Sequence, residues 1–494
     1  MKLKKIVKEI PLKQFKGSKE IEITGVCANS KLVAPGNLFV ARRGRMEDGT
    51  KYIPEAISAG AVAVLTDIYD PSLKQIAQLI HPDVSSLEGL LSAHFYQHPS
   101  SQLFTVGITG TNGKTTTSFI IKHLLDVLRG PCGLIGTIEY ILGQHRYQAT
   151  RTTPDVTTNQ KMLREMVQQN CQSAVMEVTS HALDQGRVDH VDFDVAVFTN
   201  LTLDHLDYHR TMEDYCKAKN MLFRLLSSNQ KKKKNYKKSA VVNIDSPWHQ
   251  KILEGCSASV FTYGIASKAD LYADDILLNS EGSCFTAHYQ NRTVKVQIPL
   301  VGRYNVYNSL AAMSVALTQG FDIEQIAPLM KLAPKVPGRL EPVANPLDLK
   351  IYVDFAHSDD ALINVFECLR EFKKGRILCV FGCGGERDQS KRPRMGQAAE
   401  EYADFTIITS DNPRSESPEA IAAQIAAGFK RKDSYIMDLD RRAAIEKAIS
   451  MANPDDIILI AGKGHEPYQI FAHKTIEFDD RKVAAEVCQQ LALK

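Results

Sequence analysis

The sequence predicts an α/β protein of three domains, and three observations support this. The chain has 494 residues, which is enough for about three domains at roughly 100 to 200 residues each. Its composition, with 44% hydrophobic and 24% charged residues, is typical of globular proteins. Short apolar runs alternate with helical stretches, which is the pattern of a largely parallel sheet covered by helices.

The first expected domain spans residues 1–98. β-like runs occupy residues 21–26 and 37–41, and residues 55–66 indicate a helix followed by a buried strand. Proline and serine at 99–101 predict a linker before the next apolar run. This segment is therefore expected to be a small α/β domain.

The second expected domain spans residues 99–334. Its predicted strands, at 104–108, 173–178, 193–200 and 239–244, are almost continuously apolar and are separated by helical stretches. Such strands are typical of a parallel sheet that helices bury on both faces.

The third expected domain spans residues 335–494 and begins with the Val-Pro-Gly sequence at 336–338. Strands are predicted at 350–356, 376–382, 405–410 and 455–462, with a helix at 361–372. This second alternation of strands and helices predicts a Rossmann-like domain.

The charge balance argues against a general nucleic-acid-binding protein, and the spacing of the cysteines argues against a zinc site. Sixty basic and 57 acidic residues leave a net charge of +3, which is too even for general nucleic-acid binding. The run Lys231–Lys234 with Lys237 and Lys238 predicts a solvated loop. The ten cysteines lack zinc-like spacing, and neither a signal peptide nor an 18-residue apolar span is found. We expect reduced thiols, no membrane insertion and a cytoplasmic location.

The clearest chemical motif is TVGITGTNGKTTT at 105–117, where a buried strand leads through a glycine-bearing loop into an apolar helix. In such phosphate-binding loops the lysine, here Lys114, reaches the outer phosphates and the hydroxyl, here of Thr115, binds Mg²⁺. The first glycine of the usual pattern would fall at Ile108, so Gly107 and Gly110 are expected to shape the turn.

Two further segments carry possible metal ligands. Glu177 directly follows an apolar strand, at the sheet edge where α/β proteins bind ligands, and could hold magnesium or be a solvated strand end. Asp204, His205, Asp207 and His209 share one loop, which could bind a metal or cap the next helix.

Ten motifs follow one another along nearly the whole chain: TGTNGKTTT, MEVTSHAL, NLTLDHLDYH, YCKAKNMLF, GRYNVYNSLAA, VPGRLEPV, VDFAHSDDAL, GCGGERDQSKRP, SDNPRSE and AGKGHE. In this order and at these separations they resemble the Mur ligases of peptidoglycan synthesis, especially the ligases that add the third residue of the stem peptide.

The resemblance implies an ATP-dependent ligase with one substrate for each domain. The first domain would bind the UDP-sugar, the central domain ATP and the third the amino acid. ATP would phosphorylate the carboxylate of UDP-N-acetylmuramoyl-L-alanyl-D-glutamate, and the amine of meso-diaminopimelate would attack the acyl phosphate to give an amide, ADP and phosphate. We expect a monomer whose domains close around the bound nucleotide.

The resemblance also implies the catalytic residues, namely Lys114, Glu177, His205 and Lys219. Mg²⁺ would be held by Thr115, Glu177, His205 and Lys219. The last of these would be an N-carbamate formed from CO₂, because an ammonium repels Mg²⁺ whereas a carbamate offers it oxygen ligands. Without the resemblance, Lys219 would be taken for a surface lysine.

The remaining implied contacts fall into three groups. Those to ATP are Gly110, Thr111, Asn112, Gly113, Lys114, Thr115, Thr116, Asn305, Arg339, Asp354 and His357. Those to the UDP-muramoyl dipeptide are Ser30, Thr152, Thr153, Ser180, Gln185 and Arg187, with residues 42–44 near the pyrophosphate. Those to diaminopimelate are Arg392, Asp411, Asn412, Pro413, Arg414, Gly462 and Glu466, supported by Arg387. Asp359 replaces the family's proline at an expected helix start.

The resemblance implies meso-diaminopimelate as the amino acid, because the sequence from Asp411 to Arg414 has the form of this motif associated with the enzymes that add it. A guanidinium can pair bidentately with the second carboxylate of diaminopimelate, which lysine lacks. Alternatives are the same ligation with L-lysine, a folylpolyglutamate synthetase of related fold, and a P-loop nucleotide switch that makes no amide.

Overall fold

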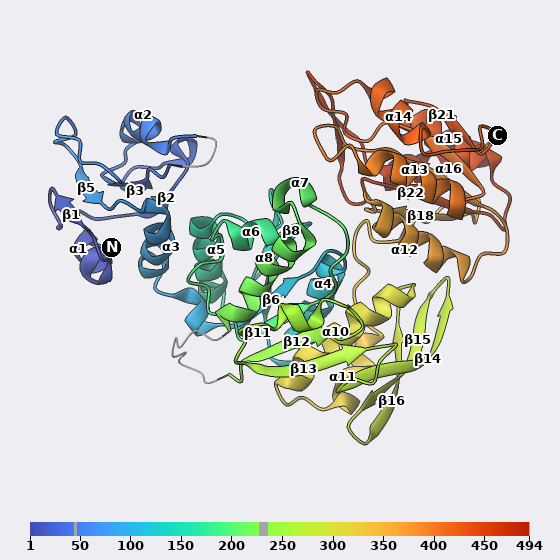
Figure 1. Cartoon of the computed structure of the whole chain (residues 1–494), viewed down its shortest axis with the longest axis horizontal. Helices are drawn as coiled ribbons and strands as arrows, with labels where there is room; N and C mark the ends of the chain where they lie inside the picture. The colour runs from blue at the N-terminus through green and yellow to red at the C-terminus, as the bar shows by residue number, and fades with distance from the viewer. Residues whose placement is uncertain (44–46, 227–235, 494) are drawn as a thin grey trace.

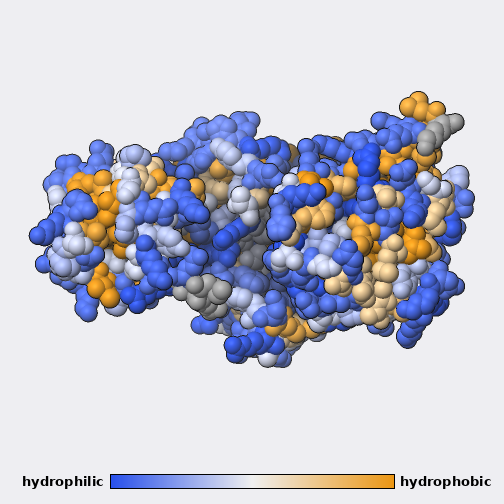
Figure 2. All heavy atoms as spheres, turned by 90° about the horizontal axis from the view of Figure 1, so that it is seen from above, coloured by the Kyte–Doolittle hydropathy of each residue, from blue (hydrophilic) through white to orange (hydrophobic). Residues whose placement is uncertain are grey.

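The computed structural model describes residues 1–43, 47–226 and 236–493. Three separate α/β bodies follow one another, with the central body between the other two (Figure 1). Seen from above, the molecule is hollowed between the N-terminal and C-terminal bodies, and this face is mainly hydrophilic (Figure 2).

The N-terminal body contains a five-stranded sheet in the order β1-β5-β4-β3-β2, parallel except for β1. On β3, Leu38 and Val40 pack beneath α1 and α3, whereas Phe39 faces α2. The elements are β1 (Gln14–Lys16), β2 (Gly25–Cys27), β3 (Asn37–Val40), β4 (Ala63–Thr66), β5 (Ala77–Ile80), α1 (Leu3–Ile6), α2 (Ile53–Ser58) and α3 (Val84–Phe95).

The central body contains an eleven-stranded sheet in the order β16-β15-β14-β13-β12-β11-β6-β10-β7-β8-β9. Its middle strands, from β7 to β14, are parallel, and antiparallel hairpins extend both edges. The strands are β6 (Phe104–Thr109), β7 (Cys132–Ile135), β8 (Glu139–Leu142), β9 (His145–Gln148), β10 (Ser173–Glu177), β11 (Val195–Phe198), β12 (Ser239–Asn243), β13 (Ser259–Gly264), β14 (Leu271–Asn279), β15 (Gly282–Tyr289) and β16 (Arg292–Ile298).

Helices bury both faces of this sheet, as its apolar strands predict. Val195 and Val197 of β11 pack in the core beneath α4, α10 and α11, whereas Ala196 and Phe198 pack with α5, α6, α8 and α9. The helices are α4 (Lys114–Leu128), α5 (Val156–Gln168), α6 (Ser180–Asp184), α7 (Leu206–His209), α8 (Met212–Leu225), α9 (His249–Ile252), α10 (Arg303–Thr318) and α11 (Ile323–Met330).

The C-terminal body contains a six-stranded sheet in the order β17-β18-β22-β19-β20-β21, parallel except for β17. Helices α12, α13 and α14 cover one face, and α15 and α16 cover the other. The elements are β17 (Glu341–Pro342), β18 (Lys350–Asp354), β19 (Ile377–Phe381), β20 (Phe405–Ile408), β21 (Tyr435–Met437), β22 (Ile457–Ala461), the hairpin β23 (Tyr468–Ile470) and β24 (Thr475–Glu477), α12 (Asp359–Arg370), α13 (Lys391–Tyr402), α14 (Pro418–Ala426), α15 (Arg441–Met451) and α16 (Asp480–Ala492).

The predicted fold class, three α/β domains with mostly parallel sheets, is confirmed, and the exact boundaries at 98/99 and 334/335 stay predictions. Helix α12 begins at Asp359 although proline is absent there, because the Ser358 side chain accepts a hydrogen bond from Ala361 N–H. No helix in the described part of the chain is long and apolar enough to cross a membrane.

The predicted solvated lysine loop can be examined only at its end. Lys237 is exposed, but Lys238 differs from the prediction, because its amine pairs with the buried Asp192 and donates to Phe193 O (3.0 Å). Lys231–Lys234 lie outside the described residues, as does Gly44.

Candidate functional site

A cavity of about 1220 Å³ lies between the central and C-terminal bodies. Its walls include the loop after β6, the carboxyl ends of β10 and β11, the start of α10 and the start of α12. The carboxyl ends of parallel strands therefore open onto it, as expected for a ligand site in an α/β protein.

The loop that follows β6 forms one wall of this cavity through Thr111, Asn112 and Gly113, and it leads into α4. Gly113 has φ +83°, and a Cβ there would lie 2.3 Å from Asn308 Oδ1, so only glycine fits. Lys114 Nζ donates to Gly110 O (2.9 Å) and Thr111 O (2.8 Å), which keeps the amine over the loop. Desolvation lowers the pKa of Lys114.

Glu177, at the end of β10, is fully buried and accepts several hydrogen bonds. Thr115 Oγ1 donates to its Oε2 (3.0 Å), and Thr137 donates through both Oγ1 (2.9 Å) and its backbone N–H (2.9 Å). The Thr115 hydroxyl at the phosphate loop is therefore hydrogen-bonded to the carboxylate of Glu177, and both residues are predicted metal ligands.

Lys219 of α8 is buried, with 1% of its surface exposed, and is not the surface lysine that sequence alone would indicate. Its Nζ donates to Gly110 O (2.8 Å) and lies 4.5 Å from the centre of the Tyr215 ring. Burial, reinforced by the charge of Lys114, lowers the pKa of Lys219 well below its ordinary value.

His205 lines the same cavity, in the left-handed conformation (φ 56°) directly before α7. Its Nε2 lies 3.6 Å from Asp204 Oδ2, and its ring lies 4.9 Å from that of His181. Burial lowers the pKa of His205 to about 3, against the opposing effect of Asp204. A neutral imidazole, which can act as a ligand, is therefore present at pH 7.

Arg339 and Asp354 reach the cavity from the C-terminal side. Arg339 Nη2 donates to Thr115 Oγ1 (3.3 Å), and its guanidinium lies 4.8 Å from the centre of the Phe355 ring. Asp354 is buried and accepts from the backbone N–H groups of Leu340 (2.6 Å) and Ala356 (2.7 Å). His357 also lines the cavity.

Two residues that we did not predict complete this wall. Asn308 lines the cavity, whereas the predicted Asn305 lies behind it, donating to Val301 O (2.8 Å) and accepting from Asn308 (3.0 Å). Asp360 of α12 accepts from Asn112 Nδ2 (2.7 Å) and Thr202 Oγ1 (2.9 Å). Asp360 thereby joins the C-terminal body to the phosphate loop.

The residues predicted to bind the dipeptide are only partly brought together. Thr152, Thr153 and Arg187 line the cavity, and Arg187 donates to Gln185 Oε1 (2.6 Å) and Thr153 O (3.0 Å). Ser180 instead contacts His209 Nε2 (2.9 Å). Ser30 lies in the N-terminal body, outside this cavity.

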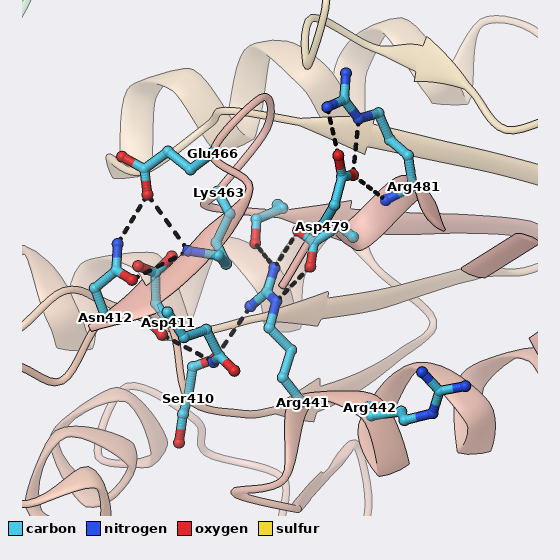
Figure 3. Close-up of polar contacts among 12 residues, drawn as sticks. Ser410, Asp411, Asn412, Arg441, Arg442, Lys463, Glu466, Asp479 and Arg481 are labelled. Atoms are coloured by element: carbon cyan, nitrogen blue, oxygen red, sulfur yellow. Dashed lines mark hydrogen bonds and ion pairs between the residues drawn. The ribbon is translucent and has the colours of Figure 1, made fainter. Parts of the chain in front are cut away.

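A second polar cluster lies at the carboxyl ends of β20 and β22 (Figure 3). Asn412 Nδ2 donates to Glu466 Oε2 (2.8 Å), and Lys463 Nζ donates to Asn412 Oδ1 (3.1 Å). Gly462 has φ +109°, and a Cβ there would lie 2.6 Å from Asp411 Oδ2. Sequence reasoning chose Gly462 and Glu466 but missed the lysine between them.

Three arginines of the same region differ in their burial and in their hydrogen-bond partners. Arg414 follows Pro413, and its Nη1 donates to Gly385 O (2.6 Å). Arg392 has no exposed surface, and its guanidinium donates to a carboxylate, an amide oxygen and a carbonyl, belonging to Glu416 (2.8 Å), Gln424 (2.7 Å) and Gly384 (3.1 Å). Arg387, by contrast, is exposed and donates to Glu386 O (3.1 Å). Arg392 is thus buried among protein acceptors, and its contact with the amino acid stays a prediction.

Within residues 1–43, 47–226 and 236–493, no three His, Cys, Asp or Glu side chains lie together in a way that could hold a metal. The oxygens of Thr115 and Glu177 nevertheless fit Mg²⁺, which proteins bind through one or two carboxylates together with phosphates of the substrate.

Models of known protein families match segments of all three bodies. The models described as "Mur ligase family, catalytic domain", "Mur ligase middle domain" and "Mur ligase, glutamate ligase domain" match residues 22–95, 108–316 and 338–464.

Similar proteins match over the full length. A protein of Chlamydia pneumoniae named UDP-N-acetylmuramoyl-L-alanyl-D-glutamate--2,6-diaminopimelate ligase is 44% identical over 490 residues, and one of the same name from Syntrophomonas wolfei is 41% identical over 489. Each alignment covers 99% of both chains. A solved structure titled as that ligase has a TM-score of 0.70 at 31% identity, covering 100% of this chain and 99% of the other. The chain belongs to the Mur ligase family.

Proposed function

We propose that this ATP-dependent ligase joins meso-diaminopimelate to the D-glutamyl carboxylate of UDP-N-acetylmuramoyl-L-alanyl-D-glutamate, releasing ADP and phosphate. The observation that carries the proposal is the cavity in which Lys114 and Thr115 face residues from the C-terminal body, with the buried Glu177 accepting from Thr115 directly behind them. The names of the full-length relatives supply the substrates.

In this proposal the phosphate loop binds the ATP phosphates through its backbone N–H groups and Lys114. Mg²⁺, held by Thr115, Glu177, His205 and a carbamate on Lys219, would offset the negative charge that develops on the transferred phosphoryl group. Arg339 and Asp354 bind nucleotide from the opposite wall. Closure of the C-terminal body over the loop keeps water from the acyl phosphate.

The environment of Lys219 supports its modification. Carbamate formation needs a neutral amine to attack CO₂, and burial beside Lys114 favours the neutral form of Lys219. The resulting carbamate would put an anion in place of an amine next to the proposed magnesium site.

Diaminopimelate has an ammonium and a carboxylate at its distal end, and the C-terminal cluster offers complementary groups. Glu466 can accept from the ammonium, while Asn412 and Arg414 can donate to the carboxylate. Arg387 is exposed and, like Arg414, lies beside Gly384, so we propose it as the second guanidinium in place of the buried Arg392. L-Lysine would leave these donors without a partner.

The test is phosphate release from ATP with Mg²⁺ and UDP-muramoyl dipeptide, comparing meso-diaminopimelate, L-lysine and no amino acid, with the product mass measured. Release and a tripeptide product only with diaminopimelate are expected. Equal use of lysine would refute the proposed specificity, and release indifferent to all three would indicate a nucleotide switch.

A further inference from the structure

Lys463 is a fully buried lysine that the reaction described above does not use. It lies two residues after the end of β22 and has no exposed side-chain surface. Its Nζ donates to Asn412 Oδ1 (3.1 Å) and lies 3.4 Å from Glu466 Oε2, and it lies 5.6 Å from the centre of the Tyr468 ring. Burying a lysine is costly, so a lysine in this position needs a reason.

The contacts of Lys463 determine which way the Asn412 amide points. An ammonium has three donors and no acceptor, so the atom that faces it must be an oxygen. Ile470 N–H also donates to Asn412 Oδ1 (3.0 Å), which adds a second donor on the same side. The Nδ2 group is therefore directed toward Glu466 Oε2, 2.8 Å away (Figure 3).

The reversed amide would place two acceptors, Asn412 Oδ1 and Glu466 Oε2, against each other. It would also turn the Asn412 donor away from Glu466. The orientation matters because a donor beside an acceptor suits a ligand that bears a carboxylate beside an ammonium, whereas two acceptors suit an ammonium alone.

A buried ion pair keeps the two supporting segments in register. Arg441 and Asp480 are both fully buried and joined by bonds of 2.7 Å. Arg441 also donates to Ser410 O (3.3 Å) and Ala461 O (3.0 Å), close before Asn412 and Lys463 in the chain. Lys463 and Asn412 are thus presented to each other by a fixed frame.

We propose that Lys463 is a positioning residue for the amino-acid substrate: by fixing the amide orientation of Asn412, it makes the cluster selective for an amino acid with a distal carboxylate. This inference rests on the proposed function, because it concerns how the same site distinguishes diaminopimelate from lysine. Lys463 acts through Asn412 and does not itself touch the substrate.

The test compares Lys463→Met with the wild type in the complete ligase reaction. The KM for meso-diaminopimelate should rise about tenfold or more, which is the loss expected for a hydrogen bond to a charged group. The KM values for ATP and for UDP-muramoyl dipeptide should stay within about twofold. Lys474→Met, at an exposed lysine of the same body, is the matched control and should leave all three unchanged.

A double-variant cycle separates positioning from a general structural effect. If Lys463 acts through Asn412, Lys463→Met should add nothing to the KM effect of Asn412→Ala. Lys463→Gln, whose amide can still donate to Asn412, should lie between the wild type and Lys463→Met. If Lys463→Met does not fold, the same double-variant cycle can be measured with Lys463→Gln.

The outcomes are distinct. An unchanged KM for diaminopimelate, or effects that multiply in the double variant, would overturn the role of Lys463. Failure of the wild type to make a tripeptide from diaminopimelate would instead overturn the proposed function.

Discussion

Replacing Glu177 by glutamine tests the proposed magnesium site most directly. The substitution keeps the shape of the side chain but removes its charge. Glutamine Oε1 can still accept from Thr137 N–H, and the hydroxyls of Thr115 and Thr137 can rotate to accept from its Nε2. Since charge-assisted bonds are about twice as strong as neutral ones, we expect a loss of only about 1 to 2 kcal/mol in the free energy of unfolding.

Activity should respond far more strongly than stability. If Glu177 holds Mg²⁺ at the phosphate loop, the rate of phosphate release at fixed Mg²⁺ should fall at least roughly a hundredfold, or about 2.7 kcal/mol. Raising the Mg²⁺ concentration should restore part of this loss, because a weakened ligand set is then filled by mass action.

The assay is amide-coupled phosphate release over a series of Mg²⁺ concentrations, with chemical denaturation of the same samples. Asp194→Asn is a matched control, because Asp194 is also buried and accepts from a backbone N–H, that of Thr105 (2.8 Å). Thr105 does not line the cavity, whereas Thr115 and Thr137, the partners of Glu177, do. Comparable activity losses in both variants, or a loss that Mg²⁺ does not alter, would refute the reasoning.

Three further predictions concern the framework. Arg441→Met should lower the free energy of unfolding by about 3 to 5 kcal/mol in urea denaturation, because Asp480 is left buried and unpaired; a loss below about 1 kcal/mol would contradict this. Gly113→Ala should raise the KM for ATP at least about tenfold, since its Cβ would lie 2.3 Å from Asn308 Oδ1 at φ +83°, and an unchanged KM would show that the loop adapts. Burial lowers the pKa of His465 to about 4 from 6.5, so the unfolded state binds the proton first and stability falls as pH drops below about 6.5. His465→Gln should reduce the wild-type loss between pH 7 and pH 5 by about 1 kcal/mol, allowing for partial exposure, and identical pH curves would exclude this assignment.

The sheets could be predicted because their signal is local. β11 and β22 are apolar runs whose alternate residues pack on opposite faces, and a run of this kind is visible in a short window of sequence. The phosphate loop was equally accessible, since strand, glycines and helix start follow one another at 104–114.

Contacts between segments that lie far apart in the sequence cannot be recognised from a short window of sequence. Asp360 joins Asn112 across 248 positions, and nothing near Asp360 in the sequence indicates its partner. The partners of Arg392 could not be predicted for the same reason, because a motif match gives the residue type but not whether a neighbour such as Glu416 already pairs with the guanidinium. The contact of Thr137 with Glu177 could have been predicted, because Thr137 follows β7 at the sheet edge where Glu177 also lies.

Two buried lysines show why burial changes the functional interpretation of a lysine. At the sequence level Lys219 and Lys463 are both ordinary, yet the structure buries each beside a different partner. Near Lys114 the loss of solvent favours a neutral amine on Lys219, which suits covalent reaction with CO₂. Beside Glu466 and Asn412 a lysine has an acceptor for its donors, which suits a fixed hydrogen-bonding role. Two lysines of one chain can thus serve opposite ends of the same reaction, one near the phosphoryl group and the other near the amino acid.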